Sequence, residues 1–126
     1  MDEAKSILKV LVSAAEDKKA GDLEVISVKG LTTLSDYFMI LTGTSTPHVK
    51  ALADEMEKAA KEKLDLLPHH VEGYNAGNWI LLDFGHVLVH IFLAETRRFY
   101  SLERLWGDAP KIDLTEFRPD GPAEKK

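Results

Sequence analysis

The chain has 126 residues, of which 44% are hydrophobic, so it can form one domain with a substantial core. It has no cysteine, which excludes disulfides, thiol catalysis and cysteine-bound metal, and no apolar run approaches the roughly 20 residues that cross a bilayer. The formal net charge of −5 argues against a protein that grips nucleic acid through its phosphates and agrees with docking onto a basic protein, although ordinary cytosolic acidity explains it equally well. Because the opening Met1-Asp2-Glu3 lacks the basic start of a signal peptide, we expect a cytoplasmic protein with no membrane contact.

The N-terminal part predicts one amphipathic helix followed by two strands. Residues 2–19 repeat apolar side chains at helical spacing, and Gly21-Asp22 ends this helix. Residues 23–28 and 37–42 are short runs typical of strands. The apolar stripe of the helix consists of Ala4, Ile7, Leu8, Leu11, Ala14 and Ala15.

A second helix is predicted to begin after Thr46. The Thr46 hydroxyl can cap it, and Pro47 at the first helical position loses no hydrogen bond. Pro68 closes this helix, residues 69–72 predict a short edge strand, and residues 73–78 a loop. The core stripe of the helix consists of Val49, Leu52, Ala53, Met56, Ala60 and Leu64.

Residues 79–92 predict a β-hairpin, because two apolar runs flank a connection that contains glycine. A three-residue loop over residues 83–85, with Gly85 in the left-handed conformation, avoids placing the bulky Phe84 at positive φ. Both faces of this hairpin are largely apolar. We therefore expect it in the middle of a sheet, with one face under helices and the other under helices or a second molecule.

The pairing register of this hairpin decides the environment of Trp79. The favoured loop places Trp79 on the same face as Val87 and Ile91. A shift by one residue would place it with His86 and His90 instead. We prefer the first register.

The last predicted helix begins near Glu95, and Gly107 can end it. Its apolar stripe consists of Phe99, Leu102, Leu105 and Trp106. The element order predicts an α/β fold: a single domain over residues 1–107 with a mixed five-stranded sheet packed by three helices. Residues 108–126 are expected to form a poorly ordered C-terminal tail, although three apolar residues could let part of it lie against the domain. These are Ile112, Leu114 and Phe117.

Catalytic and metal-binding patterns are weak. The segment Gly43-Thr44-Ser45 between a strand and a helix could hold a phosphate, but a capped helix after a flexible glycine is the favoured interpretation. A Walker lysine and the paired carboxylates of a nucleotidyltransferase are missing. His86 and His90 could begin a zinc site, but a third ligand is not evident, and His90 is better explained as a packed core histidine with one satisfied nitrogen. We expect no catalytic residues, no cofactor and no metal.

Three blocks of residues resemble the ribosomal silencing factor family, also called the Iojap-related family. The matching residues are Trp79, Leu82-Asp83, Gly85, Val89-His90, Phe92, Arg97, Tyr100, Leu102-Glu103 and Leu105-Trp106; upstream Asp36-Tyr37-Phe38, Thr42-Gly43-Thr44-Ser45, His48-Val49 and Ala53-Asp54; and the opening helix with Lys18-Lys19-Ala20. The resemblance implies a fold related to nucleotidyltransferases but without catalysis. It also implies binding to the fourteenth ribosomal protein of the large subunit, which blocks joining of the small subunit when nutrients run short. The family usually has Asp where this chain has His86, so that contact would lose a negative charge and gain a pH dependence.

Given that resemblance, exposed aromatic and acidic residues are candidates for the partner-binding site. Trp and Tyr dominate the energetics of protein interfaces, and carboxylates can pair with Lys or Arg of a basic partner. Core packing of the tryptophans and ordinary solvated carboxylates are the alternatives. The candidate residues are Trp79, Leu81, Asp83, His86, Tyr100, Glu103, Trp106 and Asp36.

The sequence therefore predicts a non-enzymatic translational repressor that binds the large ribosomal subunit and acts by occlusion. A homodimer of the free protein through the same apolar face is also expected. An assembly factor for the large subunit and, less favoured, a nucleotide-using transferase are the alternatives.

Overall fold

The computed structural model describes residues 3–100, 104, 107 and 109–117. Its elements are α1 (Glu3–Asp17), β1 (Gly21–Ser27), β2 (Tyr37–Gly43), α2 (Thr46–Leu64), β3 (His70–Glu72), β4 (Trp79–Asp83), β5 (Val87–Leu93), α3 (Ala94–Tyr100) and the 3-10 turn η1 (Leu114–Phe117). The strands form one sheet in the order β1-β2-β5-β4-β3. Among the strand pairs of the described residues, only the central pair, β2 with β5, is parallel. This confirms the predicted mixed five-stranded sheet with three helices.

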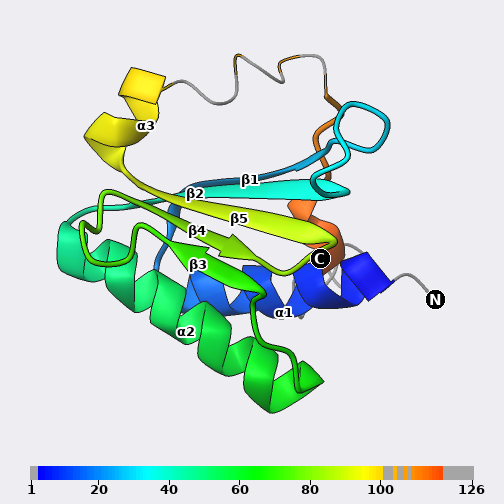
Figure 1. The fold of residues 1–126 in the computed structure, drawn as a ribbon, viewed down its shortest axis with the longest axis horizontal. Coiled ribbons are helices and arrows are strands. Elements are labelled where there is room, and N and C mark those ends of the chain that lie inside the picture. The colour runs from blue at the N-terminus through cyan, green and yellow to red at the C-terminus, as the bar shows by residue number, and fades with distance from the viewer. Residues whose placement is uncertain (1–2, 101–103, 105–106, 108, 118–126) are drawn as a thin grey trace, which may run out of the picture.

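Helices α1 and α2 cover one face of the sheet, which we call the first face (Figure 1). The apolar stripes predicted for the two helices are buried there, because residues three and four apart lie on the same side of a helix. The sheet contributes alternate residues of each strand, among them Met39, Ile80 and Val89. The main core therefore lies between the helix pair and the sheet.

Helix α2 is capped by Ser45 rather than by Thr46 as predicted. The Ser45 side chain accepts a hydrogen bond from the N–H of His48 at 3.2 Å, with Ser45 in an extended conformation. The preceding Gly43 allows a close approach, because a Cβ there would lie 2.7 Å from Cγ2 of Val49. The helix ends before Pro68, at Leu64, because Asp65 adopts the left-handed conformation and turns the chain away.

The predicted register of the β4–β5 hairpin is wrong. Gly85 is left-handed as predicted, with φ of 85°, but the connection comprises residues 84–86. Trp79 pairs with Phe92 and shares a face with His90. Two interactions explain this register: Phe84 is buried in the first-face core, and the Trp79 indole N–H donates to Nδ1 of His90 at 3.2 Å.

The opposite face of the sheet, which we call the second face, buries a smaller apolar cluster. It consists of Ile26, Val28, Phe38, Ile40, Leu88, Phe92 and Ala109, with Trp79 and Leu81 packed at its border. His90 lies in this cluster with 5% of its surface exposed, and its ring packs against the rings of Phe38 and Phe92. Its Nε2 has no hydrogen-bond partner, so it is a core histidine with one satisfied nitrogen. Burial lowers the pKa of His90 to about 4.

Part of the expected C-terminal tail packs against the domain. The N–H of Ser27 donates to the carbonyl of Pro110 at 2.8 Å, and the N–H of Ile112 donates to the carbonyl of Val25 at 2.8 Å. The chain then turns through η1 and inserts Phe117 into the first-face core beside α1. We call residues 110–117 the C-terminal strap. The domain boundary at residue 107 stays a prediction.

Among the described residues, no helix combines the length and apolar character that a membrane-spanning segment requires.

The depressed pKa of His90 predicts a specific loss of stability in acid. His90 takes up a proton near pH 6.5 in the unfolded chain but only near pH 4 in the folded protein. The stabilisation that comes from burying the neutral imidazole is therefore complete above pH 6.5 and is lost as the pH falls toward 4. The full loss is about 3 kcal/mol. We expect chemical denaturation of the variant His90→Gln, which keeps an acceptor for Trp79, to show a smaller loss over this pH range. Parallel curves for the variant and the unaltered protein would contradict the assignment.

The strap predicts a large effect at Phe117. Its side chain is 3% exposed, so Phe117→Ala should lower the free energy of unfolding by about 3 kcal/mol through the cavity it leaves. The matched control is Phe99→Ala, because Phe99 is 81% exposed and should change stability by less than about 0.5 kcal/mol. Urea titration measures both. A loss of stability in Phe117→Ala as small as that expected for Phe99→Ala would show that Phe117 does not anchor the strap.

Candidate partner-binding surface

Trp79 joins the buried second face to solvent. It begins β4, and its indole ring is only partly buried. One side of the ring contacts Phe92, with centroids 4.8 Å apart, and its N–H is held by His90. Another side contacts Tyr100 of α3, also with centroids 4.8 Å apart. Trp79 is therefore fixed in orientation while part of its surface faces outward.

Helix α3 adds two aromatic side chains to this region. Tyr100 is 51% exposed and Phe99 81% exposed, and their rings meet edge to face at 5.1 Å. Phe99 belongs to the apolar stripe predicted for this helix, but it is exposed, because α3 buries none of its seven residues. Leu81 lies two residues beyond Trp79 on the same face and is partly buried. We call Trp79, Leu81, Phe99 and Tyr100 the aromatic surface.

A shallow cavity adjoins the aromatic surface at the edge of the sheet. Its volume is about 340 Å³, and it is lined by Glu72, Gly73, Asn78, Trp79 and Leu81. All three residues of the edge strand β3 are exposed. An apolar side chain of a partner could enter this cavity beside the indole, where polar groups of the 73–78 loop form the rim.

The acidic candidates gather at the other end of β4. His86 lies between two carboxylates, with Nδ1 3.1 Å from Asp36 and Nε2 3.6 Å from Glu3. A carboxylate oxygen of Asp83 accepts the N–H of Gly85 at 2.8 Å, so this side chain shapes the turn. We call Asp36, Asp83 and His86 the acidic corner. The Asp36–His86 contact offsets part of the negative charge there whenever the imidazole is protonated.

The predicted site residues therefore form two groups rather than one. Trp79 and Asp83 are the two ends of β4, which places them about 13 Å apart at the usual rise along a strand. The predicted contacts Glu103 and Trp106 lie outside the described residues. A single partner would have to span the sheet to touch both the aromatic surface and the acidic corner.

The segment Gly43-Thr44-Ser45 has its polar groups occupied by the protein itself. The N–H of Thr44 donates to Nδ1 of His48 at 2.9 Å, and Nε2 of His48 donates to the carbonyl of Lys18 at 2.7 Å. With Ser45 capping α2, these contacts tie the start of α2 to the end of α1. The geometry supports the capped-helix interpretation of this segment rather than a phosphate loop.

The two histidines that could begin a zinc site do not lie together. His86 precedes β5 and faces the carboxylates of the acidic corner, whereas His90 is buried against Trp79. Within the described part of the chain, no group of three or more His, Asp or Glu side chains could hold a metal ion.

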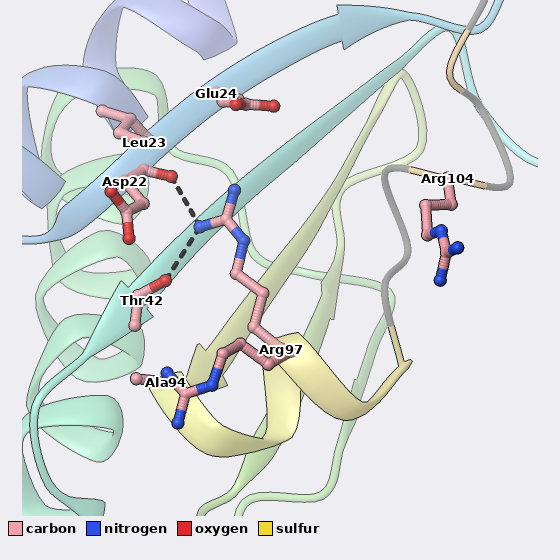
Figure 2. Close-up of a pocket in the computed structure, with 8 residues that line it drawn as sticks. Asp22, Leu23, Glu24, Thr42, Ala94, Arg97 and Arg104 are labelled. Carbon is pink, nitrogen blue, oxygen red and sulfur yellow. Dashed lines mark hydrogen bonds between the residues drawn. The ribbon is translucent and has the colours of Figure 1, made fainter.

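Sequence reasoning missed a cavity lined by arginines. Its volume is about 680 Å³, and it lies at the carboxyl ends of β2 and β5. Arg97 extends from α3 toward β1 and β2, where Nη1 donates to the carbonyl of Asp22 at 2.6 Å and to Oγ1 of Thr42 at 2.8 Å (Figure 2). The carbonyl of Asp22 is available because the β1–β2 pairing is irregular between Gly21 and Glu24. The other lining residues are Leu23, Glu24, Ala94, Arg98 and Arg104.

One sequence signal pointed to this cavity. Arg97 and Arg104 are seven residues apart, which would place both on one side of the helix that the sequence predicts from about Glu95. The remaining wall comes from β1 and β2, far away in the sequence, and no spacing rule connects them to α3. We call this the arginine cavity.

Comparison with known proteins gives consistent relationships. The model of the family described as "Ribosomal silencing factor during starvation" matches residues 1–126. The ribosomal silencing factor RsfS of Bacillus subtilis is 41% identical over 110 residues, which cover 87% of this chain and 92% of that protein. The mouse protein named "Mitochondrial assembly of ribosomal large subunit protein 1" is 39% identical over 105 residues, which cover 82% of this chain and 46% of that protein. A crystal structure of a Chromobacterium violaceum protein superposes with a TM-score of 0.80 at 36% identity, covering 84% of this chain and 88% of that one.

The family match spans the described domain and the strap together, and the fold agrees with that of a related crystal structure. This chain therefore belongs to the ribosomal silencing factor family.

Proposed function

We propose that this protein binds the large ribosomal subunit through its fourteenth ribosomal protein and prevents the small subunit from joining by occupying the space between them. The action needs no reaction and no cofactor. Membership of the ribosomal silencing factor family supports the ribosomal role. The two finer points, the particular ribosomal protein and the block of joining, are our proposal.

The exposure of the aromatic surface is the observation that carries this proposal. Phe99 and Tyr100 present large apolar areas to water, and they adjoin a partly exposed indole that is already held in place. Covering such side chains contributes about 1.5–3 kcal/mol each. Because Trp79 is held by Phe92 and His90, little side-chain entropy is lost when a partner packs on it. The aromatic surface thus has the composition of an interface centre.

Charge supports a basic partner. The chain carries a formal net charge of −5, and the partly exposed Asp36 and Asp83 lie at the acidic corner. Exposed carboxylates at the border of an interface steer and orient a basic surface more than they add affinity. We assign the aromatic surface to affinity and the acidic corner to orientation, with Glu103 and Trp106 as further proposed contacts.

We also propose that the free protein forms a homodimer in the cytoplasm through the aromatic surface. The centre of the second face is already buried within the chain, so the exposed apolar residues on α3 and β4 remain for self-association. Binding of the ribosomal protein would then compete with the dimer.

A role in assembly of the large subunit is a second candidate. The observation that favours it is the name of the mouse relative, which refers to assembly of the mitochondrial large subunit. Both roles would use the same contact on the large subunit. They differ in whether the protein acts on mature subunits.

Alanine substitutions in the aromatic surface should weaken binding to the large subunit. Phe99→Ala and Tyr100→Ala should each cost about 2 kcal/mol, or about thirtyfold in Kd, as measured by co-sedimentation with purified large subunits. Both side chains are exposed, so unfolding midpoints should not move. Trp79→Ala should also weaken binding. Because Trp79 donates a hydrogen bond to the buried His90, this variant should also lower the free energy of unfolding, and both quantities need to be measured.

The matched control is Leu67→Ala. Leu67 is 58% exposed in the connection between α2 and β3, and the end of α2 from which this connection leaves lies far from α3 (Figure 1). This variant should bind like the unaltered protein. Unchanged affinity of both α3 variants would place the interface elsewhere.

Addition of the protein to mature subunits should reduce the fraction of joined ribosomes in a sucrose gradient. We expect the protein to migrate with the large subunit and Tyr100→Ala to lose most of the effect. If the subunits join normally while the protein remains bound, silencing is wrong and the assembly role is favoured.

A further inference from the structure

The arginine cavity lies where α/β sheets commonly bind ligands. β2 and β5 are parallel neighbours, and the cavity opens beyond their carboxyl ends, at Thr42 and Ala94. In open sheets the crevice outside the carboxyl ends of parallel strands is the usual ligand position. The aromatic surface uses none of the residues that line this cavity.

The charges around the cavity have the opposite sign to the chain as a whole. Arg97, Arg98 and Arg104 line it, and Nζ of Lys111 lies 3.6 Å from the carboxylate of Glu24 at its wall. Among the described lining residues Asp22 and Glu24 are the only acids, so three arginines face two carboxylates, and Lys111 pairs with Glu24 from outside the lining. The cavity therefore has a local excess of positive charge in a chain of formal net charge −5. Guanidinium groups match phosphate oxygens in geometry and in charge.

Two details indicate more than a diffuse cationic patch. Arg97 is fixed by its bonds to the Asp22 carbonyl and the Thr42 hydroxyl, so one wall is preorganised (Figure 2). On β1, Oε1 of Glu24 is buried and has no hydrogen-bond partner, while Oε2 faces Lys111. A buried acceptor without a donor is costly, and a ligand that carries a hydroxyl would satisfy it.

We propose that the arginine cavity binds the sugar–phosphate backbone of RNA, with phosphate on the arginines and a ribose 2′-hydroxyl donating to Glu24. A phosphate beside a hydroxyl is the chemistry of a ribonucleotide, and the 2′-hydroxyl separates RNA from DNA. This inference rests on the proposed function, since the RNA would be that of the large subunit next to the docked protein. The contact is independent of base sequence and supplements the protein contact. The net charge of −5 opposes RNA binding by the molecule as a whole, so the affinity has to come from the local positive charge of the arginine cavity.

Short labelled oligonucleotides test the cavity without the ribosome. The unaltered protein should bind a fluorescent single-stranded RNA hexamer at low salt about tenfold more tightly than the DNA hexamer of the same sequence, by fluorescence anisotropy. The double variant Arg98→Gln with Arg104→Gln should bind RNA about tenfold more weakly. Its log–log salt slope should be reduced by about 0.7 for each phosphate that the arginines no longer neutralise. Equal binding by the double variant and the unaltered protein would overturn the proposal.

The matched control removes two positive charges elsewhere. Lys58 and Lys63 lie along the groove between α1 and α2, away from the arginine cavity. Lys58→Gln with Lys63→Gln should keep RNA affinity within about twofold. A loss equal to that of the arginine variant would show a general charge effect and overturn the proposal.

The role of Glu24 is tested by the ratio of RNA affinity to DNA affinity, which a change in net charge alone should not alter. Glu24→Ala should abolish the preference for RNA over DNA without weakening DNA binding, because it removes an acceptor and a negative charge together. Glu24→Gln keeps an acceptor and should retain part of the preference. A preference that persists in Glu24→Ala contradicts the assigned role of Glu24. Adenosine monophosphate that competes as well as the hexamer would point to a free nucleotide and overturn the RNA assignment.

Large subunits separate this inference from the proposed function. The arginine double variant should bind them about tenfold more weakly, with a smaller salt dependence, while Phe99→Ala changes the aromatic surface and removes none of the contacts that hold α3 on the sheet. If the unaltered protein binds subunits and the arginine variant binds equally well, the cavity is not an RNA contact and the proposed function stands. If the arginine variant binds subunits weakly but the unaltered protein ignores RNA hexamers, the arginines face an acidic protein and the RNA proposal fails. If the unaltered protein does not bind large subunits, the proposed function fails. Binding of the RNA and DNA hexamers then still tests whether the arginine cavity holds RNA.

Discussion

The parallel pairing of β2 with β5 is the constraint on which the rest of the structure depends. These two strands form the centre of the sheet, and nearly all of their residues are buried. Parallel strands at the centre of a sheet require cover on both faces. Helices α1 and α2 cover the first face, and the second face buries its own cluster around Phe38, His90 and Phe92. The same pairing brings the carboxyl ends of both strands to one edge, where the arginine cavity opens.

Short helix α3 connects the two proposed binding regions. Consecutive residues on it serve different surfaces: Arg97 and Arg98 line the arginine cavity, and Phe99 and Tyr100 extend the aromatic surface. A helix of seven residues with no buried side chain has little stability of its own. The bonds from Arg97 to β1 and β2 and the Trp79–Tyr100 contact therefore position α3 on the sheet. A ligand at either region would stabilise the helix for the other.

The sequence was sufficient to predict the helices and strands whose apolar residues recur at a regular spacing. The stripes of α1 and α2 and the short strands follow directly from apolar spacing, so the fold class was predictable. The hairpin register was not, because the buried Phe84 and the Trp79–His90 hydrogen bond are tertiary interactions that no turn rule contains. The exposure of Phe99 was missed for a related reason: a helical stripe shows that residues share a side but does not show what covers that side. The aromatic candidate Trp79 was predictable as an amphipathic residue at a strand start. The arginine cavity was not, because its walls meet only in three dimensions.

The strap has a consequence for how the chain matures during synthesis. Phe117 completes the core beside α1, and Lys5 lies 3.7 Å from Glu116, so the beginning and the end of the described chain meet on the same face. Contacts so distant in sequence form late and slow the folding of a small domain. A nascent chain whose residues 110–117 are still inside the ribosome lacks the side chain that seals this core. Protein made on a ribosome would therefore reach its full stability only after Phe117 has left the exit tunnel.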